Sequence, residues 1–567
     1  MADIHYGPAV PFCEELHAQK YRSEGESFRE SVCRIASSLK DNDEHFQHLK
    51  AILLDMRFMP AGRIQTAIGS TKNVTPYNCY VLPIEDSFVD GDNSIMQAAS
   101  YAAQTMRMGG GVGYDFSRLR PRGALIKKLQ SQSSGPISFM EIFDAVCRCV
   151  ASSGHRRGAQ MGILRVDHPS IEEFIHAKNN QTKLTGFNIS VAVTDEFMAA
   201  VLSGKSFPLR FKGEIYRFVD AQALWESIMR STWDWAEPGV IFIDQVNRMN
   251  NLYYCETLKA CNPCGEQPLP DFGACLLGSF NLVKYLKRDL YNGNRYGMDY
   301  SQLKLDIPHI VRAMDNVIDC AIYPLVQQEK EAKLKRRMGL GITGLANAAE
   351  AIGYVYGSSE FLSFTESVLK FLANECYRAS STLAVEKGVF PAFNSKKYCN
   401  GNFVQMLDAD VQESIAKQGL RNSHLTSLAP TGTISLCADN VSSVVEPVFD
   451  YEFDRTVMEF NGPRKETVQD YGVRVFGVYG KRCVDVTARE HVDVLVTAQK
   501  YVDSAVSKTC NVSSSMPWDD FKNIYMDAWQ RGAKGCSTFN SDGKRAGVLE
   551  SKNLSSCDIV NGKRSCE

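Results

Sequence analysis

Residues 255–282 read CETLKACNPCGEQPLPDFGACLLGSFNL and hold four of the chain's 18 cysteines. The Cys261-x-x-Cys264 spacing permits a zinc knuckle, but the pairing with Cys255 and Cys275 is irregular and no second CxxC occurs. A thioredoxin-like redox pair is also conceivable, although the strand-then-helix context of such a pair is not evident. Spacing alone leaves both readings open beside the simplest one, in which each cysteine is a small buried apolar residue.

Within this segment, Asn262, Cys264 and Glu266 alternate with Pro263 and Gly265. In an extended loop, residues i, i+2 and i+4 point to the same side, which would bring an amide, a thiol and a carboxylate together. The amide can hold a hydroxyl group and the carboxylate can take its proton, while the thiol can act as a nucleophile or a radical carrier. The alternative is an ordinary turn with a buried cysteine and a surface glutamate.

The composition is that of a soluble globular protein. The 567 residues are 44% apolar and 23% charged, which excludes disorder as the main state. With 63 basic and 65 acidic residues the formal net charge is −2, which argues against a nucleic-acid coat or a polybasic membrane anchor. No secretory signal and no transmembrane-length apolar run is visible, and the cysteines are too dilute for a disulfide scaffold. We therefore expect a cytoplasmic protein with neither a nucleic-acid nor a membrane partner.

Hydrophobic periodicity predicts an α/β protein. Short apolar strands are expected at 187–193, where apolar and other residues alternate, and at 240–243. Helical spacing of apolar residues predicts helices at 28–58, 138–152, 221–236, 302–325, 329–355, 359–387, 489–507 and 517–531. Short strands interleaved with longer helices favour a buried parallel sheet. From residue 541 the chain is polar, and we expect a flexible tail.

Further motifs follow one another along the chain. They are FMPAGR (58–63), TPYNCYVLP (75–83), MGGGVGYDFSRLRPRG (108–123), SGHRRGAQMG (153–162), MGLGITGLANAAEAIG (338–353), LAPTGTIS (428–435) and VVEPVF (444–449). Together with NPCGE and CLLGSFNL, this series resembles the catalytic subunit of ribonucleotide reductase, over nearly the whole chain. GGGVG and FSRLRPRG, with KGCSTFNSDGKR near the C-terminus, are most similar to the dimeric branch of the adenosylcobalamin-dependent class.

The resemblance implies a ten-stranded α/β barrel in which a finger loop carries a radical cysteine, preceded by a short helical region. The expected division is an N-terminal helical region at 1–60, the barrel with its active and specificity sites at 61–540, and a flexible C-terminal tail at 541–567. No counterpart of the ATP-cone of many relatives is recognisable at the N-terminus, so overall on/off control by dATP is not expected.

The implied activity is the reduction of ribonucleoside diphosphates to 2′-deoxyribonucleotides, the precursors of DNA. Cys264 would be the radical cysteine, which takes the 3′-hydrogen of the ribose. Glu266 would take the proton of the 3′-hydroxyl, and Asn262 would hold the sugar hydroxyls. Cys79 and Cys275 would then supply two electrons and end as a disulfide, which another thiol pair must reduce again.

The resemblance also assigns substrate and reductant contacts. Ala61, Asn78 and Gly110 would lie against the substrate. The LAPTGTIS motif would hold the diphosphate, although alone it is equally typical of a capped helix start. Its residues are Pro430, Thr431, Gly432, Thr433, Ile434 and Ser435. Cys557 and Cys566 in the tail would relay electrons from a thioredoxin- or glutaredoxin-type protein, unless they are idle exposed thiols.

A second nucleotide site, for a nucleoside triphosphate effector, is implied at the edge of a homodimer. Asp86 and Ser87 would meet the sugar and base of the effector, and Arg120 and Lys127 its phosphates. Arg156 would relay the identity of the effector to the substrate. Taken singly, Arg120 or Lys127 is equally well explained as a solvated surface charge.

The source of the radical is inferred from residues that are missing. The metal-radical class uses a tyrosine pair on a late barrel strand, but this chain has no tyrosine after Tyr525 and has Ser537 and Thr538 at the matching place. This favours adenosylcobalamin held directly over Cys264, with no metal ion bound by side chains. No D-x-H-x-x-G motif occurs, so the cobalamin forms that need a protein histidine on cobalt are not supported. Two alternatives remain: a metal-radical enzyme that needs a second subunit, and a non-catalytic nucleotide- or zinc-binding protein on this scaffold.

Overall fold

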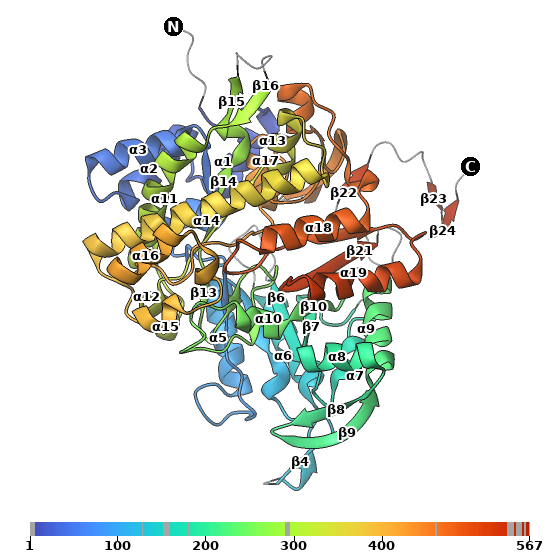
Figure 1. The fold of residues 1–567 in the computed structure, drawn as a ribbon. Helices are drawn as coiled ribbons and strands as arrows, with labels where there is room; N and C mark the ends of the chain where they lie inside the picture. The colour runs from blue at the N-terminus through green and yellow to red at the C-terminus, as the bar shows by residue number, and fades with distance from the viewer. Residues whose placement is uncertain are drawn as a thin grey trace.

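The computed structural model describes residues 6–127, 129–150, 159–179, 182–289, 295–459, 462–540, 549–551, 558–560 and 563–565. Figure 1 shows a mixed α/β arrangement in which the strands lie at the centre and the helices cover them. Two buried sheets carry most of the core, one mostly parallel and large, the other small.

Helices α1 (Pro11–Tyr21), α2 (Phe28–Leu39) and α3 (Asp43–Leu54) precede the first strand, β1 (Phe58–Pro60). Ser27 and Glu30 form a reciprocal capping box that starts α2, and a separate cap starts α3. The single helix predicted over 28–58 is therefore two helices and a strand. Polar caps interrupt the chain there even though the apolar periodicity continues across them.

The larger sheet has eight strands. In spatial order they are β13 (Ala274–Cys275), β2 (Cys79–Val81), β3 (Gly111–Asp115), β6 (Gln160–Arg165), β7 (Phe187–Val193), β10 (Gly239–Phe242), β21 (Gly535–Asn540) and β20 (Thr509–Val512). The five from β2 to β10 are parallel, β13 and β21 join them antiparallel, and β20 runs parallel to β21. Both predicted strands are confirmed, as β7 and β10. Every residue of β3 is buried, as expected for a sheet that is covered on both faces.

Five amphipathic helices bury this sheet. They are α5 (Ile95–Arg107), α6 (Pro136–Cys149), α9 (Ala221–Trp235), α18 (Ala488–Gln499) and α19 (Trp518–Gln530). Figure 1 shows α18 and α19 lying along β21, and α19 and α9 both contact that strand. The predicted helix over 489–507 ends at Gln499, because the residues that follow run as a loop against the active-site segments.

The smaller sheet consists of β1, β14 (Leu277–Asn281) and β17 (Gly339–Thr343), with β14 at its centre. Around it pack α11 (Tyr300–Cys320), α12 (Val326–Lys335), α13 (Leu345–Ile352) and α14 (Ser359–Lys387). The helix predicted over 329–355 was wrong, because a buried strand divides it into α12 and α13. Helical periodicity does not detect β17, since all of its residues are apolar or small and all are buried. The helix predicted over 359–387 is confirmed as α14.

The finger loop is a short hairpin of β11 (Ala260–Cys261) and β12 (Pro268–Leu269). It passes very close to the larger sheet at Gly113 of β3. A β-carbon at this position would lie 1.9 Å from the carbonyl oxygen of Cys261, so only glycine is tolerated here. The GGGVG motif is thus part of a strand, and one of its glycines makes room for the finger.

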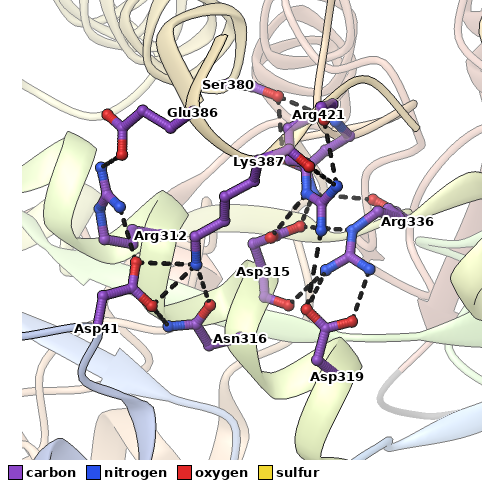
Figure 2. Close-up of polar contacts among 12 residues, drawn as sticks. Asp41, Arg312, Asp315, Asn316, Asp319, Arg336, Ser380, Glu386, Lys387 and Arg421 are labelled. Carbon is purple, nitrogen blue, oxygen red and sulfur yellow. Dashed lines mark hydrogen bonds and ion pairs between the residues drawn. The ribbon is translucent and has the colours of Figure 1, made fainter. Parts of the chain in front are cut away.

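A network of charges joins the N-terminal helices to the body of the protein (Figure 2), and it is buried around Asp315 and Arg336. The carboxylate of Asp41, before α3, forms ion pairs with Nη1 of Arg312 in α11 at 2.7 Å and with Nζ of Lys387 in α14 at 2.8 Å. The side chain of Asp315 is fully buried and binds Arg336 at 2.8 Å and Arg421 at 3.0 Å. The two buried charges of the network, Asp315 and Arg336, are thus paired with each other and with further charges, as burial requires.

The remaining elements are short or peripheral. They are α4 (Gly62–Ala67), β4 (Leu125–Ile126), β5 (Ser131–Gln132), α7 (Ile171–Ile175), α8 (Asp195–Ser203), β8 (Ser206–Phe211), β9 (Glu214–Asp220), α10 (Ile243–Arg248), β15 (Leu286–Asp289), β16 (Arg295–Met298), α15 (Ser395–Cys399), α16 (Ala409–Gln418), α17 (Gly432–Cys437), β18 (Glu452–Glu459), β19 (Gly462–Gln469), β22 (Leu549–Ser551), β23 (Asp558–Val560) and β24 (Lys563–Ser565). β22, which lies in the predicted tail, pairs antiparallel with β18. Among the described residues, none of the helices has the length and apolar character needed to cross a membrane. The α/β class with a large, mostly parallel sheet is confirmed.

Candidate active site

A cavity of about 400 Å³ lies where the finger hairpin meets both sheets, and we call it the main cavity. Its walls come from α1, α4, β2, β14, the finger and the turn before α17. The predicted site residues that line it are Ala61, Asn78, Cys79, Cys264, Glu266 and the turn at 430–434. Segments that are far apart in the chain therefore bring a thiol, a carboxylate and a hydroxyl-rich turn to one enclosed space.

Cys79 and Cys275 face each other directly across the paired strands β2 and β13. Neither forms a disulfide in this structure, and both are buried. Directly opposed residues in antiparallel strands have β-carbons about 4.5–5.5 Å apart, just beyond the separation of about 3.5–4.5 Å found in disulfides. A small shift of these two short strands would therefore let a disulfide form. Cys79 reaches the cavity wall, and Cys275 lies behind it.

The surroundings of Cys261 and Cys275 keep these two thiols protonated. Burial raises the pKa of Cys275 well above its usual range, and the nearby Glu266, Cys79 and Cys264 raise it further. Burial, with Glu266 and Cys79, also raises the pKa of Cys261. Thiolates are what metal ions and disulfide exchange require, whereas a protonated thiol retains a hydrogen atom that it can give up. Cys261 and Cys275 therefore hold their hydrogens in this site, as hydrogen-atom chemistry requires.

The tip of the finger is a tight turn, so the expectation of an extended loop was wrong. Gly265 N–H donates to the carbonyl of Asn262 at 3.0 Å, and the Asn262 side-chain oxygen accepts from Gln267 N–H, also at 3.0 Å. The Asn262 oxygen is thus used inside the loop, and the residue does not line the main cavity. Glu266 is only 2% exposed, which also excludes the alternative of a surface glutamate.

A second cavity of about 370 Å³ lies on the other side of the finger, and Cys264 lines both spaces. Its walls include β7, β10, β20 and β21, with Ser190, Lys508, Lys534 and Ser537 among the polar side chains. None of the described lining residues is a histidine. Cys264 is therefore reached from two cavities. One is lined by the turn at 430–434, and the other by β7, β10, β20 and β21.

The turn before α17 is held in a strained conformation. Thr431 has φ +55°, a left-handed value that is uncommon for a residue other than glycine. Its hydroxyl accepts from Val444 N–H at 3.0 Å and lies 3.2 Å from the Thr343 hydroxyl. These contacts fix the backbone of the turn at the cavity wall. Ser435 instead lies 3.1 Å from the Ser443 hydroxyl and does not line the cavity.

Of two predicted substrate contacts, Asn78 lines the main cavity and Gly110 does not, and two cationic residues were missed. Gly110 packs against Thr105 and Tyr80 and does not line the cavity. The side-chain oxygen of Asn78 is buried and meets no hydrogen-bond donor among the described residues, so a ligand can supply one. Lys20 and Arg63 line the cavity and add positive charge. Arg63 belongs to the FMPAGR motif, whereas nothing in the sequence near Lys20 indicated a site.

Comparison with known proteins gives the same assignment as the motifs. Residues 77–539 match the family model described as ribonucleotide reductase, barrel domain. The chain belongs to the ribonucleotide reductase family. It is 35% identical to the vitamin B12-dependent ribonucleoside-diphosphate reductase of Thermoplasma acidophilum, over 92% of this chain and 68% of the relative.

Two further members of the family are similar over most of this chain. Identity to the vitamin B12-dependent ribonucleoside-diphosphate reductase of Mycobacterium tuberculosis is 32%, over 89% of this chain and 73% of the relative. Identity to the vitamin B12-dependent ribonucleotide reductase of Streptomyces clavuligerus is 27%, over 94% of this chain and 63% of the relative. Similarity to ribonucleotide reductases thus extends over both sheets and both cavities.

The residues expected to bind an effector in this reductase chain lie away from both cavities. Asp86 accepts from the Arg120 side chain and from Arg120 N–H, each at 3.0 Å, and Lys212 approaches it at 3.1 Å. The Ser87 hydroxyl accepts from a backbone N–H of its own turn, and Lys127 is exposed. The structure therefore brings Asp86 and Arg120 together but not Lys127.

Three predicted residues, Arg156, Cys557 and Cys566, lie outside the described residues. Within the described ranges, no group of three or more His, Cys, Asp or Glu side chains is arranged to hold a metal ion. Within those ranges no such group surrounds Cys261 and Cys264 of the reductase finger, whereas a structural zinc site takes four ligands.

Proposed function

We propose that this chain reduces ribonucleoside diphosphates to 2′-deoxyribonucleotides by thiyl-radical chemistry. The observation that carries the proposal is the main cavity, where Cys264 and Glu266 meet Cys79, with Cys275 directly opposite Cys79. The names of the relatives from Thermoplasma and Mycobacterium, ribonucleoside-diphosphate reductases, support the substrate class.

Each of these residues has its own part in the proposed reaction. A thiyl radical on Cys264 takes the 3′-hydrogen of the ribose, and Glu266 takes the proton of the 3′-hydroxyl. The 2′-hydroxyl then leaves as water. Cys79 and Cys275 supply two hydrogen atoms in total, form a disulfide, and so balance the loss of one oxygen from the sugar. Cys264, which gained a hydrogen in the first step, finally returns one to the 3′-carbon and becomes a thiyl radical again.

The substrate is held by the turn at 430–434 and by positive charge. We assign the diphosphate to the hydroxyls and N–H groups of this turn, with Lys20 and Arg63 as counter-charges. Asn78 offers its buried side-chain oxygen to a sugar hydroxyl. The role proposed for Asn262 is narrower than expected: its oxygen shapes the finger turn on which Cys264 and Glu266 depend.

The cofactor we propose is adenosylcobalamin, as the vitamin B12-dependent relatives suggest. When bound, it supplies the hydrogen-abstracting radical for Cys264. The second cavity fits its nucleoside arm: the volume is within the range of small-ligand pockets, and Ser190, Ser537 and Lys508 offer polar contacts. The absence of a histidine from the described lining agrees with cobalamin bound without a protein ligand on cobalt. The walls of this cavity would also exclude water from Cys264.

We also propose a closed barrel, a homodimer and an effector site for this chain. We infer a closed ten-stranded barrel, since β14 continues directly from β13, and single bridges link β17 to Thr426 and Leu428 to Val506 near β20. We also propose a homodimer with a nucleoside triphosphate effector site at Asp86, Ser87, Arg120 and Lys127, with Arg156 as the relay. Arg120 binds Asp86 through Nε and its backbone N–H, and the outer nitrogens of its guanidinium would meet a phosphate there. The proposed domain limits are those expected from the sequence, 1–60, 61–540 and 541–567.

The decisive experiment uses the isolated chain with cytidine diphosphate, adenosylcobalamin and dithiothreitol. We expect deoxycytidine diphosphate without a second subunit and without added iron or manganese. Cys264→Ser should make no product but still bind nucleotide, whereas Cys255→Ser, at an exposed position, should keep wild-type turnover. Turnover only after addition of a metal-loaded second subunit would establish the metal-radical alternative. Stoichiometric zinc binding without turnover under either condition would establish the non-catalytic one.

A further inference from the structure

The loop between α18 and β20 contacts two walls of the main cavity, the finger at Glu266 and the segment that leads into the turn at 430–434. Ala505 N–H donates to the carbonyl oxygen of Glu266 at 2.9 Å, and the Ala505 carbonyl accepts from Leu428 N–H at 3.1 Å. The Ser427 hydroxyl also donates to the Glu266 carbonyl, at 3.0 Å. Leu428 leads directly into the turn at 430–434. One loop therefore sets the position of the candidate proton acceptor relative to the turn.

Asp503 is the centre of this loop and is only 2% exposed. Its Oδ2 accepts from Leu425 N–H and from the Tyr377 hydroxyl, each at 2.7 Å. Its Oδ1 accepts from Thr426 N–H at 3.1 Å and from the Ser504 hydroxyl at 3.3 Å. Its own N–H donates to the Thr426 hydroxyl at 2.9 Å. The carboxylate thus fixes the segment 425–428, which leads into the turn at 430–434.

Lys534 holds the same loop from the other side. Its Nζ donates to the carbonyls of Asp503 at 2.6 Å and Ser504 at 2.5 Å, and the residue lines the second cavity. Burial lowers the pKa of Lys534 to about 8, while attraction to Asp503 opposes this shift. Asp503 therefore lies between the walls of the two cavities that share Cys264.

We propose that Asp503 is a positioning residue for the reaction: through Ala505 and Ser427 it holds Glu266 in register with the substrate turn, and Lys534 secures it from the second cavity. The inference rests on the proposed function and adds a residue that makes no contact with the main cavity itself. Its carboxylate acts through the backbone N–H groups of Leu425 and Thr426 and touches none of the reacting groups.

The chemistry requires a carboxylate at this position. Both oxygens of Asp503 accept from backbone N–H groups, those of Leu425 and Thr426. An asparagine has one oxygen and one NH₂ group, so in either orientation it presents donors to a donor. Asp503→Asn should therefore loosen the 425–428 segment, while the volume of the side chain at position 503 stays almost the same. The turn keeps an independent support, since Val444 N–H still binds Thr431.

The test compares Asp503→Asn with Asp315→Asn, a matched loss of a buried, fully paired carboxylate in the network of Figure 2. For Asp503→Asn we expect kcat to fall about 10- to 100-fold, since small displacements of reacting groups have effects of this size. KM should change by less than about threefold, because the turn retains its other contacts. Backbone hydrogen exchange in 260–269 and 425–428 should become faster. Asp315→Asn should lower stability but leave kcat and the exchange of 260–269 unchanged. Its own contacts, to Arg421 and Asn422, lie just before the 425–428 segment, so the finger is the segment that separates the two variants.

The outcomes separate this inference from the function on which it rests. If the wild-type chain makes no deoxyribonucleotide, the proposed function fails, while the exchange data still decide whether Asp503 holds the finger. Unchanged exchange, unchanged kcat, or equal losses of kcat in both variants would overturn the positioning role. If Asp503→Asn does not fold, Ser427→Ala replaces it, because it removes a single bond to the Glu266 carbonyl. A severalfold fall in kcat in Ser427→Ala supports the role, and wild-type kcat overturns it.

Discussion

At the scale of single residues, the protonation state of the buried thiols matters most. Burial next to Glu266 and two other thiols raises the pKa of Cys275, so it carries its hydrogen at neutral pH. A thiol of this kind gives up a hydrogen atom readily but reacts slowly as a nucleophile. The arrangement suits a dithiol that reduces a sugar radical, and it slows adventitious oxidation between turnovers.

Replacement of either member of the pair tests this role. Cys79→Ser and Cys275→Ser should each stop repeated turnover, because one remaining thiol cannot supply two electrons and close a disulfide. In the wild-type chain, one turnover without added reductant should produce a Cys79–Cys275 disulfide, detectable by peptide mapping. Cys376→Ser, at a buried thiol outside both cavities, is the control and should turn over normally. Both thiols found free after that single turnover would refute the assignment.

Glu350 of α13 gives a pH-dependent prediction. Burial raises its pKa from 4.5 to about 8, and the neighbouring Asp470 adds to the shift, although Lys481 N–H donates to it at 2.8 Å. Between these two pH values the folded chain keeps a proton that the unfolded chain has released. The folded state then binds more protons, so stability falls as pH rises from 4.5 to 8.

Glu350→Gln removes this penalty because glutamine does not ionise, while its oxygen still accepts from Lys481 N–H. At pH 9 we expect the variant to be more stable than wild type, by at most about 4–5 kcal/mol. Near pH 4.5 the difference should be small. Urea unfolding at both pH values measures it, with the exposed Glu413→Gln on α16 as control. A stability difference that does not depend on pH would contradict the prediction.

At the scale of elements, the position of the finger hairpin depends on a glycine in the neighbouring strand β3, which has no side chain to occupy the space. Gly113 of β3 leaves room for the carbonyl of Cys261, and Gly341 of β17 likewise meets the carbonyl of Ser427, 2.4 Å from where a β-carbon would lie. Backbone atoms cannot move aside as the end of a side chain can. The glycines of two motifs are therefore needed for close packing between strands and site loops.

Gly113→Ala tests this packing. The added methyl group must displace β11, so we expect a loss of about 1–3 kcal/mol in unfolding free energy, typical of overpacking, together with severely reduced turnover. Gly297→Ala in β16 is the matched control, since a β-carbon there meets no atom within 4 Å. Denaturant midpoints and kcat should be near wild type in the control. Normal turnover in Gly113→Ala would show that the finger tolerates displacement.

At the scale of the whole molecule, two cavities share one thiol and are separated by the finger. In the function that we propose, a radical source would approach Cys264 from the second cavity while the substrate occupies the main one. The dithiol lies on the substrate side and is buried, so a folded protein reductant has no direct access to it. A mobile relay or a small thiol must therefore regenerate it.

Removal of residues 555–567 tests whether the end of the chain is that relay. We expect wild-type turnover with dithiothreitol, which is small enough to enter the main cavity, and loss of turnover with a thioredoxin system. Cys557→Ser/Cys566→Ser should behave like the truncation, because it removes only the thiols. Equal rates with both reductants in either variant would remove these cysteines from the proposed relay.

The sequence by itself determined the family, the chemistry and much of the local structure. NPCGE and the ordered motifs identified Cys264, Glu266, Cys79 and Cys275 as a set, and local apolar periodicity predicted β7 and α14 with their observed bounds. Such features depend on residue type and on neighbours within a few positions, so they can be read along the chain.

Only the tertiary structure decided how these residues are used. Strand pairing between distant segments places Cys79 opposite Cys275 and buries Glu266, and no local pattern encodes such pairing. β17 was missed because an apolar, fully buried strand carries no alternation. The inward turn of Asn262, the two cavities around Cys264, and the part played by Asp503 all follow from packing between elements that are far apart in the chain.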